Sequence, residues 1–547
     1  MNRIINFNIK NIKLNIVNNI SKPTNKQIWL VGPEGRGKTT LIHGILDHLK
    51  NNKAESYITT YFDFKNVKDF NFQTALVKYV DSIINSASKL TQTNSKQLER
   101  VFLDLNVRFP KFNQHISSFF NHLKNSNVLK SNHKWIQSVS SLKDGISFGD
   151  WWNLCMMTYE LNPKSFGVSK QVNFNSAQLF LLFVNSIACL IDMENCQHIT
   201  PLSSSVTGQW VISYVLESIK LMMREEKMNW IICNDGIDHL VRSPFLSDRG
   251  PVFLSHLLLN LQISSLPSVF ISNDSTVPLL LTNKHYEKLF NNNVNNSMTI
   301  NRSYDPNNFI FHQVDEISQE ETMNYLNSKL AFGEKFMKCI WKITGGNLSL
   351  INKVFEDYEE FVKKVSLGTV QQILSGSTSV VDDEYFPINK SKEEQINYLR
   401  EEQFKMFLKT LQHDTFNPDI IKFENMMSSF LSSVAIEEMK LNMKNLVHFK
   451  VLVFETIRYL LNKKWLRVKD GVTINNKIIL GLIEANILYY EIPSMMLEFK
   501  NSLVKYLLNS YIQIQYEMLK AIEKIEYKAN FLLNQKTLYR DLDNLFI

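Results

Sequence analysis

Residues 32–39 read Gly-Pro-Glu-Gly-Arg-Gly-Lys-Thr, between a short apolar run at 27–31 and an amphipathic run at 39–49. The spacing Gly-x4-Gly-Lys-Thr is that of a P-loop, in which glycines let successive backbone N–H groups turn toward phosphate oxygens. The helix that follows adds the positive end of its dipole to the same place. The sequence therefore predicts a strand, a phosphate-binding loop and a helix, in this order.

Two side chains of the loop carry its chemistry. Lys38 supplies a point charge for the β- and γ-phosphates of a nucleoside triphosphate, and Thr39 supplies a hydroxyl for Mg²⁺. The residues expected to bind the nucleotide are Gly32, Gly35, Gly37, Lys38, Thr39 and Thr40.

A second part of the site is expected where the apolar stretch 229–234 ends. Asp235 is placed to hold Mg²⁺ through water, but the next position, where a base is expected, is Gly236. In the alternative register Asn234 takes the metal position and Asp235 the base position. Either register leaves the acidic pair incomplete, and hydrolysis needs a group that orients water, so we expect slow or absent turnover. Asp238 either substitutes for the base or caps the following helix.

Asn273 follows the next predicted strand, 268–272. It can reach the γ-phosphate or the attacking water, and a turn-forming role is the alternative. Asp235 and Asn273 are thus the candidate catalytic residues. The stretch 344–347, Thr-Gly-Gly-Asn, is either a nucleotide contact or a simple turn between helices. Arg242 and Arg249 are either arginine fingers for a neighbouring subunit or surface charges.

Short apolar runs, typical of buried strands, alternate along much of the chain with segments of helical periodicity. This order is typical of an α/β domain with a parallel sheet. Strands are predicted at 27–31, 56–64, 229–234, 268–272 and 309–314, and helices at 39–49, 72–84, 210–227 and 252–261. Residues 86–207, which contain Trp135, Trp151 and Trp152, predict a helical insertion without an identifiable chemistry.

Composition narrows the class of protein. The chain has 547 residues, 44% of them hydrophobic, and a net charge of +7, a mild excess that permits contact with nucleic acid without favouring it. The five cysteines form no CxxC pair, which argues against a zinc cluster or a disulfide framework. The cytoplasm is the expected compartment. The first 33 residues lack Asp and Glu, so a mitochondrial presequence, and with it the matrix, is the alternative. No apolar run is long enough to span a membrane.

Taken in order, these segments resemble the AAA+ and signal-transduction (STAND) ATPases, and most of all the archaeal-type ATPase family. The pieces that carry the resemblance are 32–39, 60–63, 231–240, 269–275, 316–321 and 344–350. The resemblance implies ATP with Mg²⁺, a five-stranded parallel sheet, a small helical lid, a C-terminal winged helix and regulated assembly or switching. Two departures concern turnover: Gly236 in the acidic pair, and Ser349 where the family has a lid arginine.

The resemblance and the local patterns together divide the chain into five expected segments. Ser375-Gly-Ser-Thr-Ser is the clearest linker, capping boxes begin at Ser318 and Ser391, and a hairpin is predicted from 465–468 and 472–474 around Asp470-Gly471. The expected divisions are an AAA+-like P-loop domain at 1–310, a helical lid at 311–374, a linker at 375–390, a winged-helix-like domain at 391–493 and a helical tail at 494–547.

Three hypotheses follow for the function. The first is an ATP-binding nucleotide-dependent switch or assembly factor with weak hydrolysis, acting on a protein partner or through self-association. The second is a DNA-binding, replication-initiator-like ATPase, since residues 237–240 also resemble origin-recognition ATPases; its basic face would use Lys463, Lys464, Arg467 and Lys469. The third is a scaffold that holds ATP as a structural, non-hydrolysed ligand.

Overall fold

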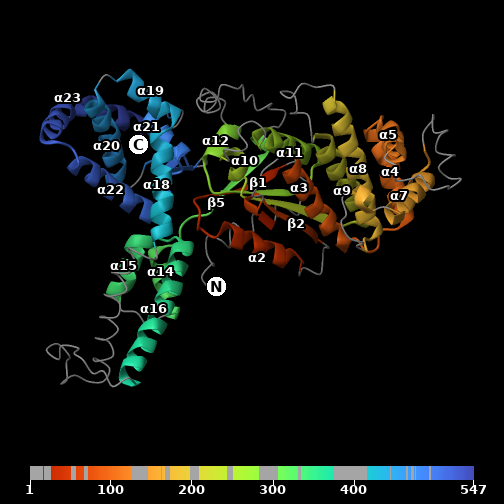
Figure 1. Ribbon diagram of the computed structural model, residues 1–547, viewed down its shortest axis with the longest axis horizontal. Helices are drawn as coiled ribbons and strands as arrows, with labels where there is room; N and C mark the ends of the chain where they lie inside the picture. Colours follow the sequence, from red (N-terminus) through yellow and green to blue (C-terminus); the bar gives the residue numbers. More distant parts are fainter. Residues whose placement is uncertain are drawn as a thin grey trace.

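A parallel sheet of five strands forms the centre of the structure, a computed structural model (Figure 1). The strands follow the order β2-β3-β4-β1-β5 across the sheet. They are β1 (Gln27–Val31), β2 (Tyr57–Asp63), β3 (Asn229–Asp235), β4 (Ser268–Ser272) and β5 (Phe309–Gln313). The predicted α/β class and parallel sheet are therefore confirmed, with strand ends within two residues of those expected.

The structure describes much of the chain, and all that follows concerns these residues. They are 16–17, 26–50, 57–66, 72–125, 146–161, 163–166, 173–197, 209–242, 250–282, 306–329, 334–374, 416–443, 445–463, 466–469, 474, 476–491 and 494–546.

Helices cover both faces of the sheet because side chains alternate along each strand. Ile28 and Leu30 of β1 pack against α2 (Lys38–Lys50) on one face. Trp29 and Val31 belong to the core of the other face. That face is covered by α3 (Phe72–Ser86), α9 (Gln209–Glu226) and α11 (Gly250–Ser264).

The predicted insertion packs onto this second face as a further helical layer. Its helices are α4 (Ser95–Arg108), α5 (Phe112–Asn125), α7 (Phe148–Leu161) and α8 (Ser176–Gln197). Trp151 and Phe180, which belong to the insertion, share one continuous apolar core with Trp29 of the sheet. Burial of these large rings gives the insertion a structural role in the core that covers this face of the sheet. Trp135 lies outside the described residues.

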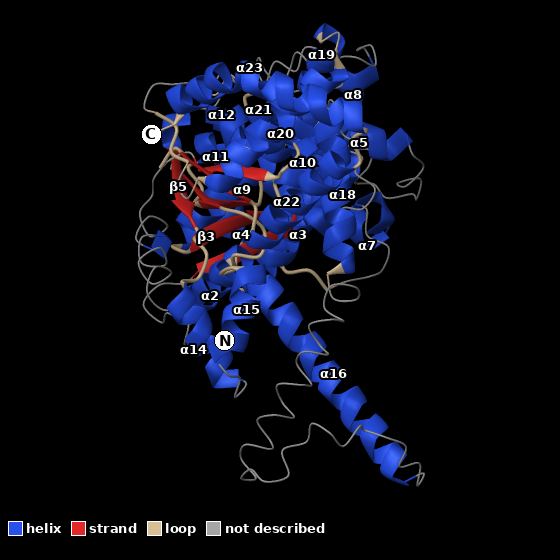
Figure 2. Ribbon diagram, turned by 90° about the vertical axis from the view of Figure 1, so that its left-hand side faces the viewer, coloured by secondary structure: helices blue, strands red, loops and turns tan. Residues whose placement is uncertain are grey.

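Three helices follow the sheet: α14 (Gln319–Lys329), α15 (Glu334–Thr344) and α16 (Leu348–Leu374). The capping box predicted at Ser318 is confirmed, since the Ser318 hydroxyl accepts from Glu321 N at 3.2 Å and the Glu321 carboxylate accepts from Ser318 N at 3.1 Å. Figure 2 shows α16 running outward from the rest of the molecule. The predicted linker, 375–390, and the second capping box at Ser391 lie outside the described residues.

The C-terminal region has its own apolar core, which also takes in Leu279 of α12 (Thr276–Thr282). Its elements are α18 (Asn417–Leu431), α19 (Val434–Asn442), α20 (Leu446–Asn462), α21 (Lys477–Glu484), β6 (Leu488–Glu491), β7 (Met496–Phe499), α22 (Ser502–Glu517) and α23 (Ala521–Leu545). The segment predicted as a helical tail thus contains β7 as well as two helices. None of the described helices combines the length and apolar character that crossing a bilayer requires.

The hairpin predicted from 465–468 and 472–474 stays a prediction, since residues 472 and 473 lie outside the described residues. Among the described residues of this region, β6 and β7 form an antiparallel pair. Arg467 and Val468 make isolated bridges to Met496 and Phe546. The Asp470-Gly471 turn lies outside the described residues. The end of the final helix therefore lies against Val468.

Candidate functional site

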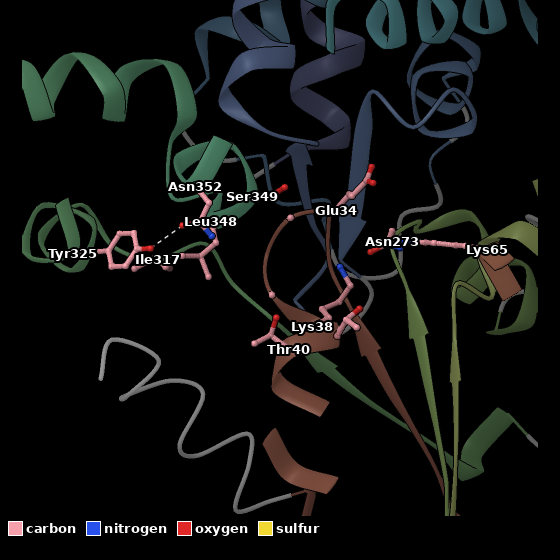
Figure 3. A pocket seen from close by; sticks show the side chains of 13 residues that line it. Glu34, Lys38, Thr40, Lys65, Asn273, Ile317, Tyr325, Leu348, Ser349 and Asn352 are labelled. Atoms are coloured by element: carbon pink, nitrogen blue, oxygen red, sulfur yellow. Dashed lines mark hydrogen bonds between the residues drawn. The ribbon is translucent and has the colours of Figure 1, made fainter. Parts of the chain in front are cut away.

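The carboxyl ends of β1, β3 and β4 meet at one edge of the sheet, where ligands bind in open α/β folds. A cavity of about 300 Å³ lies there, within the range of small-molecule sites (Figure 3). It is lined by Glu34, Gly35, Gly37, Lys38, Thr39, Thr40, Lys65, Asn273, Ile317, Tyr325, Leu348, Ser349 and Asn352. Gly35, Gly37, Lys38, Thr39, Thr40 and Asn273 are residues that the sequence pattern singled out.

The segment Gly32–Gly37, here called the glycine loop, folds back over the start of α2. Lys38 Nζ donates to the carbonyl oxygens of Gly32 at 2.6 Å and Pro33 at 2.7 Å. Burial, together with the nearby Arg36 charge, lowers the pKa of Lys38 to about 7. The charged form of Lys38 is therefore destabilised here, and a neighbouring anion would stabilise it.

This pKa gives a prediction for anion binding. A bound triphosphate would favour the charged ammonium and raise the pKa of Lys38 above 7, so that binding would take up a proton at a pH between the pKa values of the free and bound protein. Affinity should therefore fall as pH rises through that window. Calorimetry at about pH 8.5, in buffers of different ionisation enthalpy, should show uptake approaching about one proton per ATP. The Lys38→Arg variant, whose guanidinium stays charged, is the control and should show none. Equal proton uptake by both proteins would contradict the assignment to Lys38.

Thr39 and Asp235 lie together, as a Mg²⁺ site requires. Thr39 Oγ1 donates to Asp235 Oδ2 at 2.7 Å, and the Tyr61 hydroxyl donates to the same oxygen at 2.7 Å. The other oxygen, Asp235 Oδ1, is buried and accepts no hydrogen bond from the described part of the chain. A buried carboxylate oxygen of this kind needs a partner. A hydroxyl and a carboxylate are ligands that Mg²⁺ accepts, so these residues fit the ion.

The structure distinguishes the two registers proposed for β3. Asp235 faces Thr39, whereas Asn234, the preceding residue of the strand, lies toward Tyr79 of α3 on the opposite face of the sheet. Asp238 begins α10 (Asp238–Arg242), and its Oδ1 accepts from the backbone N–H of Asn273 at 3.2 Å. Asp238 therefore ties the end of β3 to the end of β4, while Asn273 lines the cavity.

The outer side of the glycine loop contacts the C-terminal region. Arg36 Nη2 lies 2.8 Å from Glu498 Oε2 and 3.8 Å from Glu316 Oε1. Glu34 Oε2 lies 2.5 Å from Lys422 Nζ and 3.3 Å from Lys500 Nζ. Burial alone would raise the pKa of Glu34, but the neighbouring lysines outweigh it and hold the pKa at about 2. At neutral pH the loop is thus held by full charges of both signs.

Sequence reasoning did not identify Glu34 and Arg36 because both occupy variable positions of the motif. Their partners lie far along the chain: Lys422 is 388 residues from Glu34, and Glu498 is 462 residues from Arg36. No local pattern carries that information. Lys65 was missed as well, although its position two residues after the end of β2 could have indicated that it lies at the site.

The turn 344–347 also contacts the glycine loop. Asn347 Nδ2 donates to the carbonyl oxygen of Glu34 at 2.9 Å, and Ser349 N donates to that of Gly35 at 3.3 Å. A Cβ atom at Gly35 would lie 2.2 Å from Asn347 Oδ1, and Gly35 has φ +88°. The turn therefore joins α15 to α16 and at the same time contacts the glycine loop.

Other residues considered from the sequence have different surroundings. Arg249 and the side chain of Arg242 lie outside the described part of the structure. Of the basic residues expected to face DNA, Lys463 lies 3.7 Å from the carboxylate of Asp543 and Lys469 donates to the Asp543 carbonyl at 2.7 Å. Those two charges are engaged within the chain. Lys464 is outside the described residues.

Part of the chain matches the model of a known family. Residues 15–136 match the model of the family described as nephrocystin 3, N-terminal. This segment of the chain is therefore similar to that family. It contains β1, the glycine loop, α2 and β2, and it ends before β3 and Asp235. No curated protein gives a significant match to the chain.

Proposed function

We propose that this protein binds ATP with Mg²⁺ at a P-loop formed by Gly32–Thr39, and that the nucleotide controls how the lid and the C-terminal region contact that loop. The observation that carries the proposal is that residues 32–39 line the cavity on one side and contact the C-terminal region on the other. Lys38 and Thr39 line the cavity, while Glu34 and Arg36 contact Lys422, Lys500 and Glu498 of the C-terminal region. A ligand that rearranges the inner side must therefore act on the outer contacts.

The physical basis is differential contact in two states. In the structure Lys38 donates to the carbonyl oxygens of Gly32 and Pro33. Phosphates compete for the same ammonium and add negative charge to a cavity that Glu34 also lines. Both changes alter the balance of charge across the contacts with the C-terminal region. When bound, Mg²⁺ would neutralise part of the phosphate charge, held by Thr39 and Asp235.

The resemblance to AAA+ and STAND ATPases supports this proposal. Slow turnover is expected, because Gly236 carries no side chain that could orient water. The C-terminal region, with a winged helix as its proposed fold, would be the part that responds to nucleotide and contacts a partner or a second copy. The DNA-binding alternative is less favoured, since Lys463 and Lys469 contact Asp543.

Hydrogen exchange tests the switch. The amides of residues 496–504 are compared in the empty protein, with Mg²⁺ and ADP, and with Mg²⁺ and a non-hydrolysable ATP analogue. We expect protection in this segment to change with the ATP analogue and not in the Lys38→Ala variant. Stoichiometric nucleotide binding with unchanged exchange would remove the switch and favour the scaffold with structural ATP.

A further inference from the structure

A second lysine, Lys65, lies in the cavity opposite the glycine loop. It belongs to η1 (Phe64–Asn66), the turn that follows β2, and its side chain lines the cavity with Lys38 and Asn273. Figure 3 shows this side chain extending toward Asn273. Its charge acts on both neighbouring groups, lowering the pKa of Lys38 and that of Glu34. The ammonium is thus close enough to act on an anion in the cavity.

The turn that carries Lys65 is anchored on both sides. Asp63 Oδ1 accepts from the backbone N–H of Lys65 at 2.9 Å, and Asp63 Oδ2 accepts from Asn66 at 3.4 Å. Phe64 is 1% exposed and packs edge-on against Phe62 and Phe253. Since β2 and β3 are paired in register, with Asp63 opposite Asp235, this turn is fixed beside the metal-binding carboxylate.

Gly236 leaves the space through which Lys65 passes. A Cβ atom at residue 236 would lie 2.9 Å from Lys65 Cγ and 3.1 Å from Asp63 Oδ1. Gly236 also has φ +68°, which side chains rarely adopt. The space beside residue 236, where a second acid was expected, is therefore taken by the stem of a lysine from the turn that follows the neighbouring strand.

We propose that Lys65 contacts the terminal phosphate of the bound nucleotide and distinguishes ATP from ADP; this inference rests on the proposed function. During hydrolysis the water oxygen forms a bond to the γ-phosphorus while the bond to the bridging oxygen breaks. The electron pair stays on ADP and the water protons go to phosphate and solvent. Lys65 transfers no proton. Its charge stabilises the negative charge on the transferring group, as cations do in phosphoryl transfer, and compensates for the absent lid arginine.

The test compares ATP and ADP binding. We expect Lys65→Ala to weaken Mg²⁺-dependent binding of a non-hydrolysable ATP analogue by about tenfold or more, and ADP binding by less than about twofold, because only ATP has the terminal phosphate. Lys65→Arg should retain most of the preference. Lys78→Ala, on the exposed side of α3, is the matched control and should leave both affinities unchanged.

A second variant tests the position of the Lys65 side chain while keeping its charge. Gly236→Ala should push the Lys65 stem aside and reduce the preference for the ATP analogue in the same way, with thermal unfolding used to verify that the variant folds. Equal loss of ATP and ADP binding in Lys65→Ala, or none, would overturn the role of Lys65 while leaving the proposed function standing. If the wild type binds neither nucleotide, the proposed function fails and this inference falls with it.

Discussion

The Lys38→Ala variant should lose at least about 100-fold in affinity for ATP, or about 2.8 kcal/mol, because the charge that meets the phosphates is removed. Lys38 is 3% exposed, and its Nζ is held beside the glycine loop by the carbonyl oxygens of Gly32 and Pro33. The loss should extend to ADP, since the ammonium is placed for the β-phosphate as well as the γ-phosphate. This breadth separates Lys38 from Lys65, whose effect should be confined to ATP.

Fluorescence anisotropy of a labelled nucleotide would measure the change. The same measurement on Lys78→Ala, an exposed lysine of α3, controls for a general loss of positive charge. Thermal unfolding of each variant shows whether the fold survives. Wild-type affinity in a folded Lys38→Ala protein would mean that phosphates do not bind at the glycine loop.

The Arg36→Glu variant should release the C-terminal region from the glycine loop. The guanidinium is 4% exposed and lies between Glu498 and Glu316. Reversal of its charge would place three carboxylates together, at a site where burial already raises the pKa of Glu316. Loss of a largely buried ion pair destabilises the folded contact by about 2 kcal/mol or more. We expect a value near the lower limit, because Glu498 is partly exposed. Amide exchange in residues 32–37 should therefore rise about tenfold or more.

A charge swap gives the decisive comparison. Arg36→Glu combined with Glu498→Arg should recover part of the protection, since the pair is rebuilt with opposite polarity. Arg100→Glu is the matched control, because Arg100 pairs with Glu225 on the surface at 3.0 Å and such pairs contribute little. Unchanged exchange in Arg36→Glu would show that the ion pair does not hold the loop.

Much of the first domain could be predicted from local pattern. β1 and β4 have the predicted bounds, and the other three strands differ by at most two residues, because each is a short apolar run between turn residues. The glycine spacing likewise placed Lys38 and Thr39 at a cavity. The partners of Arg467 and Val468 could not be predicted in this way, because Met496 and Phe546 are distant in the sequence.

The sequence by itself determined the parallel α/β class and the convergence of Lys38, Thr39, Asp235 and Asn273 on one edge of the sheet. Such features follow from residue spacing, side-chain alternation and the common edge at which parallel strands end. Only the tertiary structure decided that Asp235 rather than Asn234 meets Thr39, that Lys65 passes over Gly236, and that Glu34 and Arg36 contact the C-terminal region. Those contacts depend on strand register and on the packing of segments hundreds of residues apart, which no local pattern encodes.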